Sequence, residues 1–231
     1  DLVRSRGLGD VYKRQVQLFA RTDEILVEVI TAGEVVEITG SLVSAASGME
    51  TTLEWKVWSM NASDKLYYCV ITGLEDGCYY VNINGASSEI FRITSDEREL
   101  SGTTLLQYSS KDNRAGKDAV FWIAEQQKFF DFRVPGGFKD DGWSFNVENE
   151  QFTNSDNDLS EIYSRATTRK TFTMGGGSGC PIWFGDMLNR ILSCTYVYFD
   201  GNRFVRSEQS VPEVTKVLEG KRSYVFSQIC L

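Results

Sequence analysis

The sequence predicts a mainly β protein: an N-terminal β-sandwich of the immunoglobulin or fibronectin type, then a second β-rich domain containing one short α-helix. Aromatic residues make up 13% of the 231 residues, and aromatic side chains favour strands over helical bundles. Short runs of apolar residues, several alternating with polar ones, are separated by turn-forming residues along most of the chain, as in half-buried strands. Apolar side chains recur clearly at helical spacing only near 181–193.

The first fifteen residues, DLVRSRGLGDVYKRQ, show neither strand nor helix periodicity. They resemble a translated sequencing linker, of the kind found at the ends of proteins predicted from environmental assemblies. We therefore expect residues 1–15 to be non-native and leave them out of the fold prediction. The sequence also lacks an initiating Met and ends directly after a strand-like segment, so we interpret it as a fragment.

Residues 16–97 are expected to form the sandwich. Ala32-Gly33 is a plausible hairpin turn between the first two strands, and the segment TLEWKVWSM alternates apolar and charged side chains with period two. Six or seven short strands over about 80 residues are typical of a sandwich. The expected strands are 24–30, 34–43, 52–60, 65–74, 78–86 and 88–94.

The second domain is expected over 98–231, because the polar segment 95–103 has no periodicity and marks a boundary. A strand is predicted at 105–110. Residues 119–138 indicate two strands around a polar turn, the second of them ending at Pro135-Gly136-Gly137. An acidic loop and a strand ending near Met174 follow.

The segment after Met174 has the clearest boundaries. A glycine loop, GGGSG, leads to Pro181, which suits the first turn of a helix because its missing N–H has no helical partner there. Apolar residues at helical spacing then predict a helix over 181–193. Asp200-Gly201 predicts a tight hairpin turn between two further strands.

Composition excludes several classes of function. The formal net charge of −8 disfavours nucleic acid as a partner, because phosphate binding needs a basic face. No apolar run approaches the roughly 18 residues that span a bilayer, so no membrane insertion is expected. The chain has no histidine, which removes Ser-His and Cys-His nucleophile pairs. We expect no catalytic residues and no cofactor.

The five cysteines lack a CxxC pair, which disfavours a zinc site. Reduced cysteines packed as small apolar groups are expected, and a bridge between Cys69 and Cys78 in an oxidising compartment is the alternative. Cys180 stands at a helix start, where the helix dipole lowers a thiol pKa. No histidine base is available, so packing is the expected role. The GGGSG loop lacks the GK[ST] of a phosphate loop and is read as a connector.

Two weak candidate sites remain. Aromatic side chains outside the clearest core patterns could stack on sugar rings, and these are Trp58, Trp122, Trp143 and Tyr163. An N-x-D-x-D-x-x-E run could bind calcium through its oxygens, although a solvated acidic loop is the simpler reading. Its members are Asn154, Asp156, Asp158 and Glu161.

Three segments carry a resemblance: LLQYSSKDN, FDFRVPGGF and, above all, GCPIWFGDMLNRILSCTYVYFDG. They resemble tail- or baseplate-associated structural proteins of phages and prophages of gut bacteria, in which a sandwich-like domain precedes this block. The resemblance covers most of 16–231 and brings no catalytic residues. It implies a virion protein for assembly or host-surface contact, forming homo-oligomeric rings or binding other virion proteins.

The alternative comes from a different class of protein. A secreted or cell-surface glycan-binding module would be a monomer with an exposed aromatic platform and a Cys69–Cys78 bridge, and its partner would be a surface glycan. A carboxylate-based hydrolase is more distant still, because it requires two carboxyl groups at a defined separation across a cleft.

Overall fold

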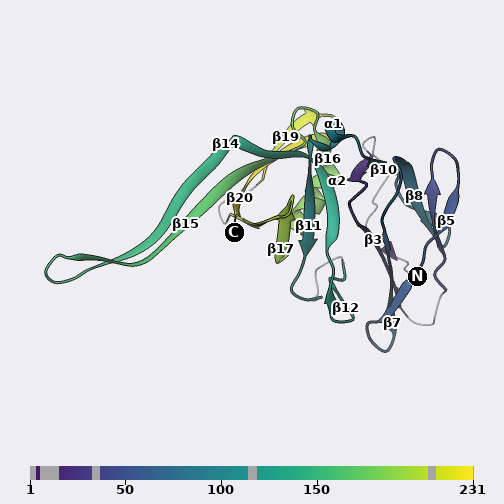
Figure 1. Ribbon diagram of the computed structural model, residues 1–231, viewed down its shortest axis with the longest axis horizontal. Coiled ribbons are helices and arrows are strands. Elements are labelled where there is room, and N and C mark those ends of the chain that lie inside the picture. The colour runs from purple at the N-terminus through teal and green to yellow at the C-terminus, as the bar shows by residue number, and fades with distance from the viewer. Residues whose placement is uncertain (1–3, 6–15, 33–36, 114–118, 208–211, 231) are drawn as a thin grey trace.

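The computed structural model describes residues 4–5, 16–32, 37–113, 119–207 and 212–230, without the side chains of 4–5 and 140–142. Its described part is mainly β, as the sequence predicts (Figure 1). Two helices are present in that part, α1 (Glu97–Leu100) and α2 (Ile182–Ile191). The strands are β1 (Arg4–Ser5), β2 (Gln17–Ala20), β3 (Ile25–Ala32), β4 (Gly40–Ser44), β5 (Glu50–Thr52), β6 (Lys56–Ser59), β7 (Asp64–Ile71), β8 (Gly77–Ile83), β9 (Ala86–Ser87), β10 (Phe91–Thr94), β11 (Thr103–Ser109), β12 (Trp122–Ile123), β13 (Gln126–Gln127), β14 (Phe130–Thr153), β15 (Leu159–Met174), β16 (Cys180–Pro181), β17 (Tyr196–Phe199), β18 (Asn202–Arg206), β19 (Glu213–Leu218) and β20 (Lys221–Cys230).

The N-terminal half is a two-layer β-sandwich. One sheet has the order β1-β3-β7-β6 and the other β2-β10-β8-β4-β5. Their facing sides share one apolar core, in which Val29, Tyr67 and Ile71 of the first sheet meet Val81 and Ile93 of the second. Residues 1–15, expected to be non-native, lie outside the described residues except for the two of β1, which pair with β3.

Two local predictions for the sandwich are wrong. The strands expected to form a hairpin across Ala32-Gly33 lie in different sheets, since β3 pairs with β1 and β7 while β4 pairs with β5 and β8. The expected single strand 52–60 is divided into β5 and β6, which also lie in different sheets. Trp55 packs against the core between these two strands. Period-two alternation continues across such a crossing, so it does not reveal that the chain changes sheets.

The C-terminal half is built on one antiparallel sheet of order β15-β14-β11-β17-β18-β20-β16. β15 also pairs with β20, from Thr168↔Cys230 to Met174↔Tyr224, so six of the strands close on themselves as a ring. Aromatic side chains fill the interior, with Phe172 in contact with both Phe199 and Phe226. The large core therefore depends on residues far apart in the sequence.

The helix and the last hairpin agree with prediction. α2 buries Phe184, Leu188 and Ile191 against the core of the ring. Pro181 ends β16 and directly precedes the first helical residue. The hairpin of β17 and β18 turns through Asp200 and Gly201, both with positive φ, as a type I′ turn requires. No helix in the described part of the chain is long and apolar enough to cross a membrane.

The expected strand end at Pro135-Gly136-Gly137 is wrong, because β14 runs through it for 24 residues. Before this point β14 pairs with β11, and after it only with β15. Gly136 has φ +122 and donates its N–H to Gly102 O at 2.9 Å. A Cβ on Gly136 would lie 2.0 Å from Thr173 O. The glycine thus bends the strand and lets it pass close to its new partner instead of ending it.

Candidate functional site: a projecting hairpin arm

The distal parts of β14 and β15 leave the body as a two-stranded ribbon, which we call the arm and define as residues 143–170 (Figure 1). Its pairing runs antiparallel from Trp143↔Lys170 to Thr153↔Leu159. One register shift interrupts it between Glu150 and Gln151, opposite Ile162. The sequence reading placed an acidic loop and one strand here and missed that residues 143–153 form the opposing strand.

The tip of the arm is closed by Asn154. Its side-chain Oδ1 accepts the backbone N–H of Asp156 at 3.0 Å and of Asp158 at 2.8 Å, and its own N–H donates to Asp158 O at 3.0 Å. This use of an asparagine side chain is an Asx-type turn, and Asn157 supplies the positive φ.

The proposed calcium ligands all lie at or near this tip. Asn154, Asp156, Asp158 and Glu161 belong to the turn and to the strand that follows it. Within the described part of the chain, no three His, Cys, Asp or Glu side chains are grouped closely enough to hold a metal ion. The Asn154 oxygen is occupied by its own loop, so the run of polar residues is explained by the turn it makes.

The four candidate aromatic residues do not share one surface. Trp58 is partly buried against the cluster of Leu66 and Val120, and Trp122 donates its Nε1–H to Ser110 O at 2.9 Å. Trp143 and Tyr163 are on the arm and both are 45% exposed.

Trp143 and Tyr163 lie on different faces of the arm and at different distances along it. The register places Trp143 and Tyr163 on opposite faces of the ribbon, because Tyr163 pairs with Glu150, seven positions from Trp143. The Lys170 Nζ lies 4.0 Å from the Trp143 ring centroid, so a cation covers one side of this ring.

Large apolar side chains of the arm are exposed to an unusual degree. On one face of β14, Trp143, Phe145 and Val147 follow one another at alternate positions, and Phe145 is 78% exposed. Near the tip, Phe152 and Leu159 are also exposed. Exposed apolar side chains of this kind on a thin ribbon make the arm a candidate contact surface.

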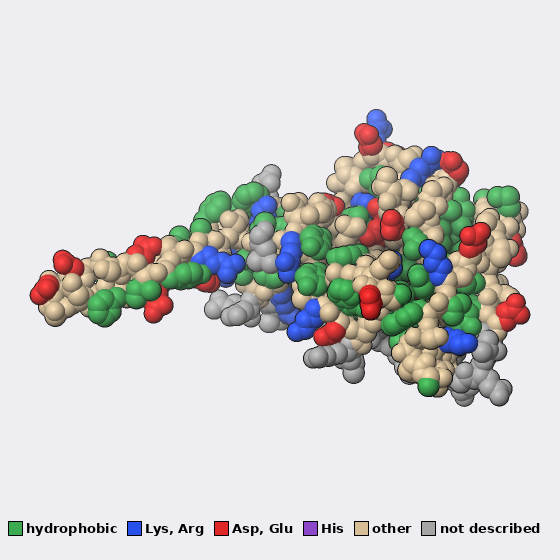
Figure 2. Space-filling view, turned by 60° about the horizontal axis from the view of Figure 1, so that its bottom comes forward, with side chains coloured by type: hydrophobic (Ala, Val, Ile, Leu, Met, Phe, Trp, Pro, Cys, Tyr) green, Lys and Arg blue, Asp and Glu red, His purple; other side chains and the backbone are tan. Residues whose placement is uncertain are grey.

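Acidic and basic residues occupy different parts of the arm. Five acidic and no basic residues occur between 148 and 163. The basic residues Arg165, Arg169 and Lys170 lie toward the body, with Lys139 just before the arm. In Figure 2 the red side chains extend to the tip, while blue ones gather where the ribbon meets the body.

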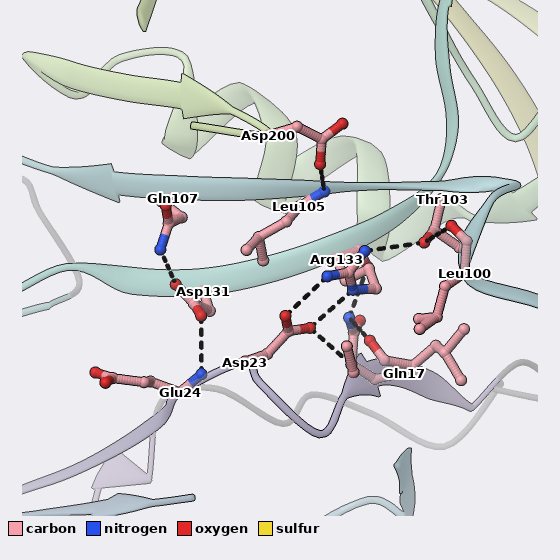
Figure 3. A network of polar contacts seen from close by, with 12 residues as sticks. Gln17, Asp23, Glu24, Leu100, Thr103, Leu105, Gln107, Asp131, Arg133 and Asp200 are labelled. Atoms are coloured by element: carbon pink, nitrogen blue, oxygen red, sulfur yellow. Dashed lines mark hydrogen bonds and ion pairs between the residues drawn. The ribbon is translucent and has the colours of Figure 1, made fainter. Parts of the chain in front are cut away.

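The body that carries the arm is fixed by a polar network between the sandwich and the strand ring (Figure 3). Arg133 on β14 donates from Nε to Asp23 Oδ2 at 2.7 Å and from Nη2 to Asp23 Oδ1 at 2.8 Å. Asp131, two residues earlier on β14, accepts the N–H of Glu24 at 2.8 Å. Gln17 donates its amide to Arg133 O at 2.7 Å. The strand that becomes the arm is therefore bonded directly to the sandwich.

Asp131 and Glu28 are both carboxyl groups at this junction. Burial raises the pKa of Asp131, and the donors Glu24 N–H and Gln107 oppose the rise. Burial raises the pKa of Glu28 further, to about 7, against the hydrogen bond from Val120 N–H at 3.0 Å. The second oxygen of Glu28 is buried and has no hydrogen-bond partner among the described residues. The junction therefore holds a carboxyl group that titrates near neutral pH.

The cysteine and glycine-loop candidates have structural roles. All five cysteines are free thiols, and Cys69 and Cys78 lie on β7 and β8 in different sheets, so they are not on adjacent strands as the alternative of a bridge assumed. Burial raises the pKa of Cys180 to about 12, which outweighs the expected effect of the helix dipole. Gly175 approaches Arg222 O so closely that a Cβ would lie 2.8 Å from it. The loop is a connector from β15 to β16 whose two ends, Gly175 and Gly179, are buried and whose middle is exposed.

Comparisons with known proteins add little to this geometry. No protein-family model and no curated protein matches the chain. Among solved structures, the chain is similar to a chain of the crystal structure of the ZIG-8–RIG-5 IG1–IG1 heterodimer, at 16% identity over 40% of this chain and 89% of that chain. The TM-score of 0.19 is too low to carry an argument.

Proposed function

We propose that this protein is a structural subunit of a phage tail or baseplate, and that the arm joins it to neighbouring subunits. The arm is the observation that carries the proposal. It is a two-stranded ribbon with exposed apolar side chains that no other part of the described chain covers. Such a ribbon has little stability of its own in water, and its edges invite pairing with another chain.

The way the arm is attached supports an assembly role. Its strands continue into the closed ring, where β15 pairs with β20 from Thr168 onward. The ring is held to the sandwich by the Arg133–Asp23 ion pair, whose side chains are 10% and 1% exposed. The arm is thus positioned by a body held together through buried contacts, which suits a subunit that must present one contact in a fixed direction.

The virion setting is supported by the resemblance of three segments to phage tail and baseplate proteins. In the structure, two of them, 105–113 and 130–138, contain the paired strands β11 and β14 at the root of the arm. The third, 179–201, contains α2 and the turn after β17. The resembling segments thus build the body from which the arm projects.

A glycan-binding module is the alternative, favoured by the exposure of Trp143 and Tyr163. It predicts a monomer, whereas the assembly proposal predicts self-association through the arm. The test is the mass of the full chain in solution, measured by light scattering over a concentration series. The matched variant has residues 147–166 replaced by Asn-Gly, which joins the paired Asn146 and Thr167 through a short turn.

We expect the full chain to form a discrete oligomer and the shortened variant to remain a monomer with an unchanged melting temperature. If the full chain is monomeric at every concentration, or if the shortened variant forms the same oligomer, the proposal is rejected. A monomer would be taken to a glycan array, with Trp143→Ala and Tyr163→Ala as the first variants.

A further inference from the structure

The free edge of the arm lies on β14. Among the described residues, β14 pairs only with β15 from Trp143 to Thr153, beyond the register shift that separates Phe138 from Trp143. β15 has a free edge there only before Thr168, where it begins to pair with β20. The β14 edge is therefore the one to which a further strand can be added over the whole paired length of the arm, from 143 to 153.

The charges of the arm are self-complementary. The distal half, 148–163, carries five acidic residues and no basic one. The root, 143–147 with 164–170, carries three basic residues, all on β15, and no acidic one. Two arms laid side by side in opposite directions place each acidic half beside the basic root of the other, so one chain supplies both halves of the contact.

The dimensions of the arm suit this overlap. The paired part of β14, from Trp143 to Thr153, is roughly 35 Å long at the usual rise of a strand. Its midpoint lies near the pair Val147↔Ala166, so the root and the distal half are of similar length. In an antiparallel overlap about that midpoint, Val147 of one copy also lies opposite Val147 of the other, and Phe145 of each copy lies two positions away on the same face of the strand.

From these observations we infer that the free edge of the arm binds the arm of a second copy of this chain. The two β14 edges pair antiparallel about a twofold axis near Val147, with each acidic distal half on the basic root of the other. The inference rests on the proposed assembly function and names the partner and the contact. Because the charged contacts are at the surface, the association is expected to weaken as salt is raised.

The test is a charge-swap experiment. One variant reverses the distal half by Glu150→Lys, Asp156→Lys and Glu161→Lys, and the other reverses the root by Arg169→Glu and Lys170→Glu. Glu148 and Arg165 are left unchanged because their positions are paired in the register of the arm. The control makes the same change in net charge as the distal variant, but on the body, by Glu50→Lys, Glu54→Lys and Glu213→Lys, all exposed residues.

Each arm variant alone is expected to raise the dissociation constant for self-association at least about tenfold, because like charges then face each other. The body control is expected to associate as the wild type does. An equimolar mixture of the two arm variants is expected to form a one-to-one complex, since the reversed charges are complementary again. Analytical ultracentrifugation measures all three.

The inference is overturned if either arm variant associates as tightly as the wild type, or if the mixture remains monomeric. If the wild type forms arm-dependent oligomers but the mixture stays monomeric, this contact is rejected and the proposed function is retained. Equal oligomers from the wild type and the arm-shortened variant would reject the proposed function itself.

Discussion

Arg133 and Asp23 form a two-pronged ion pair at 2.7 and 2.8 Å between β14 and the turn before β3. Asp23 Oδ2 also accepts the N–H of Ala20 at 2.8 Å, so the same carboxylate shapes its own turn and holds the second half of the molecule. The two residues are 110 positions apart, so this ion pair is one of the long-range contacts that hold the sandwich and the ring, and with it the arm, together.

Removing Asp23 leaves a buried guanidinium without its partner. We expect Asp23→Ala to lower the free energy of unfolding by about 3–5 kcal/mol. The double variant Asp23→Ala, Arg133→Met is expected to lose less than the sum of the single variants, because no charge is then left unpaired. Denaturant unfolding measures the cycle.

The matched control is Arg92→Met, which breaks the exposed pair with Glu99 and is expected to cost less than about 1 kcal/mol. Equal costs for Asp23→Ala and Arg92→Met would contradict the account of the junction.

Glu28 makes stability depend on pH. Its pKa is raised to about 7 in the folded protein, where burial favours the neutral form. The folded state therefore binds more protons than the unfolded state between the ordinary carboxyl pKa and about 7, and stability falls as pH rises through that window. The neutral variant Glu28→Gln removes this dependence.

We expect Glu28→Gln to raise the free energy of unfolding by roughly 3 kcal/mol at pH 8 and to change it little at pH 4. Paired denaturant unfolding of both proteins across this range measures the difference, so that other titrating groups cancel. A difference that does not vary with pH would show that Glu28 does not titrate in this window.

Gly136 is where β14 changes partners. With φ +122 and a Cβ position 2.0 Å from Thr173 O, Gly136→Ala is expected to lower stability by more than about 2 kcal/mol. Its neighbour is the control, because a Cβ on Gly137 has its nearest contact at 3.6 Å. Thermal unfolding should separate the two alanine variants clearly, and similar melting temperatures would contradict the bend described at Gly136.

The role of Asn154 in closing the turn at the tip of the arm can be tested by substitution. Asn154→Ala removes the acceptor for two backbone N–H groups, so we expect faster amide exchange at 154–158 with an unchanged global melting temperature. Ser155→Ala is the control and should leave exchange unaffected. Calcium is expected to have no effect on exchange at the tip, and slower exchange on adding calcium would restore the metal-site reading of Asp156 and Asp158.

The sequence patterns predicted those features of the fold that depend on residues close together in the chain. The fold class, α2 and the turn at Asp200-Gly201 follow from apolar spacing and from residues that tolerate positive φ. The closure of the ring through β15 and β20, and the passage of the chain between sheets at Trp55, depend on contacts distant in sequence. Period-two alternation carries no information about either.

The candidate site was predicted only in part. Trp143 and Tyr163 were singled out for exposure, and both are exposed on the arm. The arm itself was missed because Pro135-Gly136-Gly137 was taken as a strand end, although Trp143, Phe145 and Val147 alternate with polar residues beyond it. That alternation was the available signal. Nothing in the sequence pattern indicates that Asp23 pairs with Arg133.

The central claim is that the arm is covered by a second copy, and hydrogen–deuterium exchange at low and high protein concentration tests it directly. We expect the β14 amides of residues 143–153 to exchange quickly when dilute and to become protected as concentration rises, because pairing at the free edge engages their outward N–H groups. Protection of β20 within the ring should not change. Exchange in the arm that is independent of concentration, in a sample whose mass does increase, would contradict the claim.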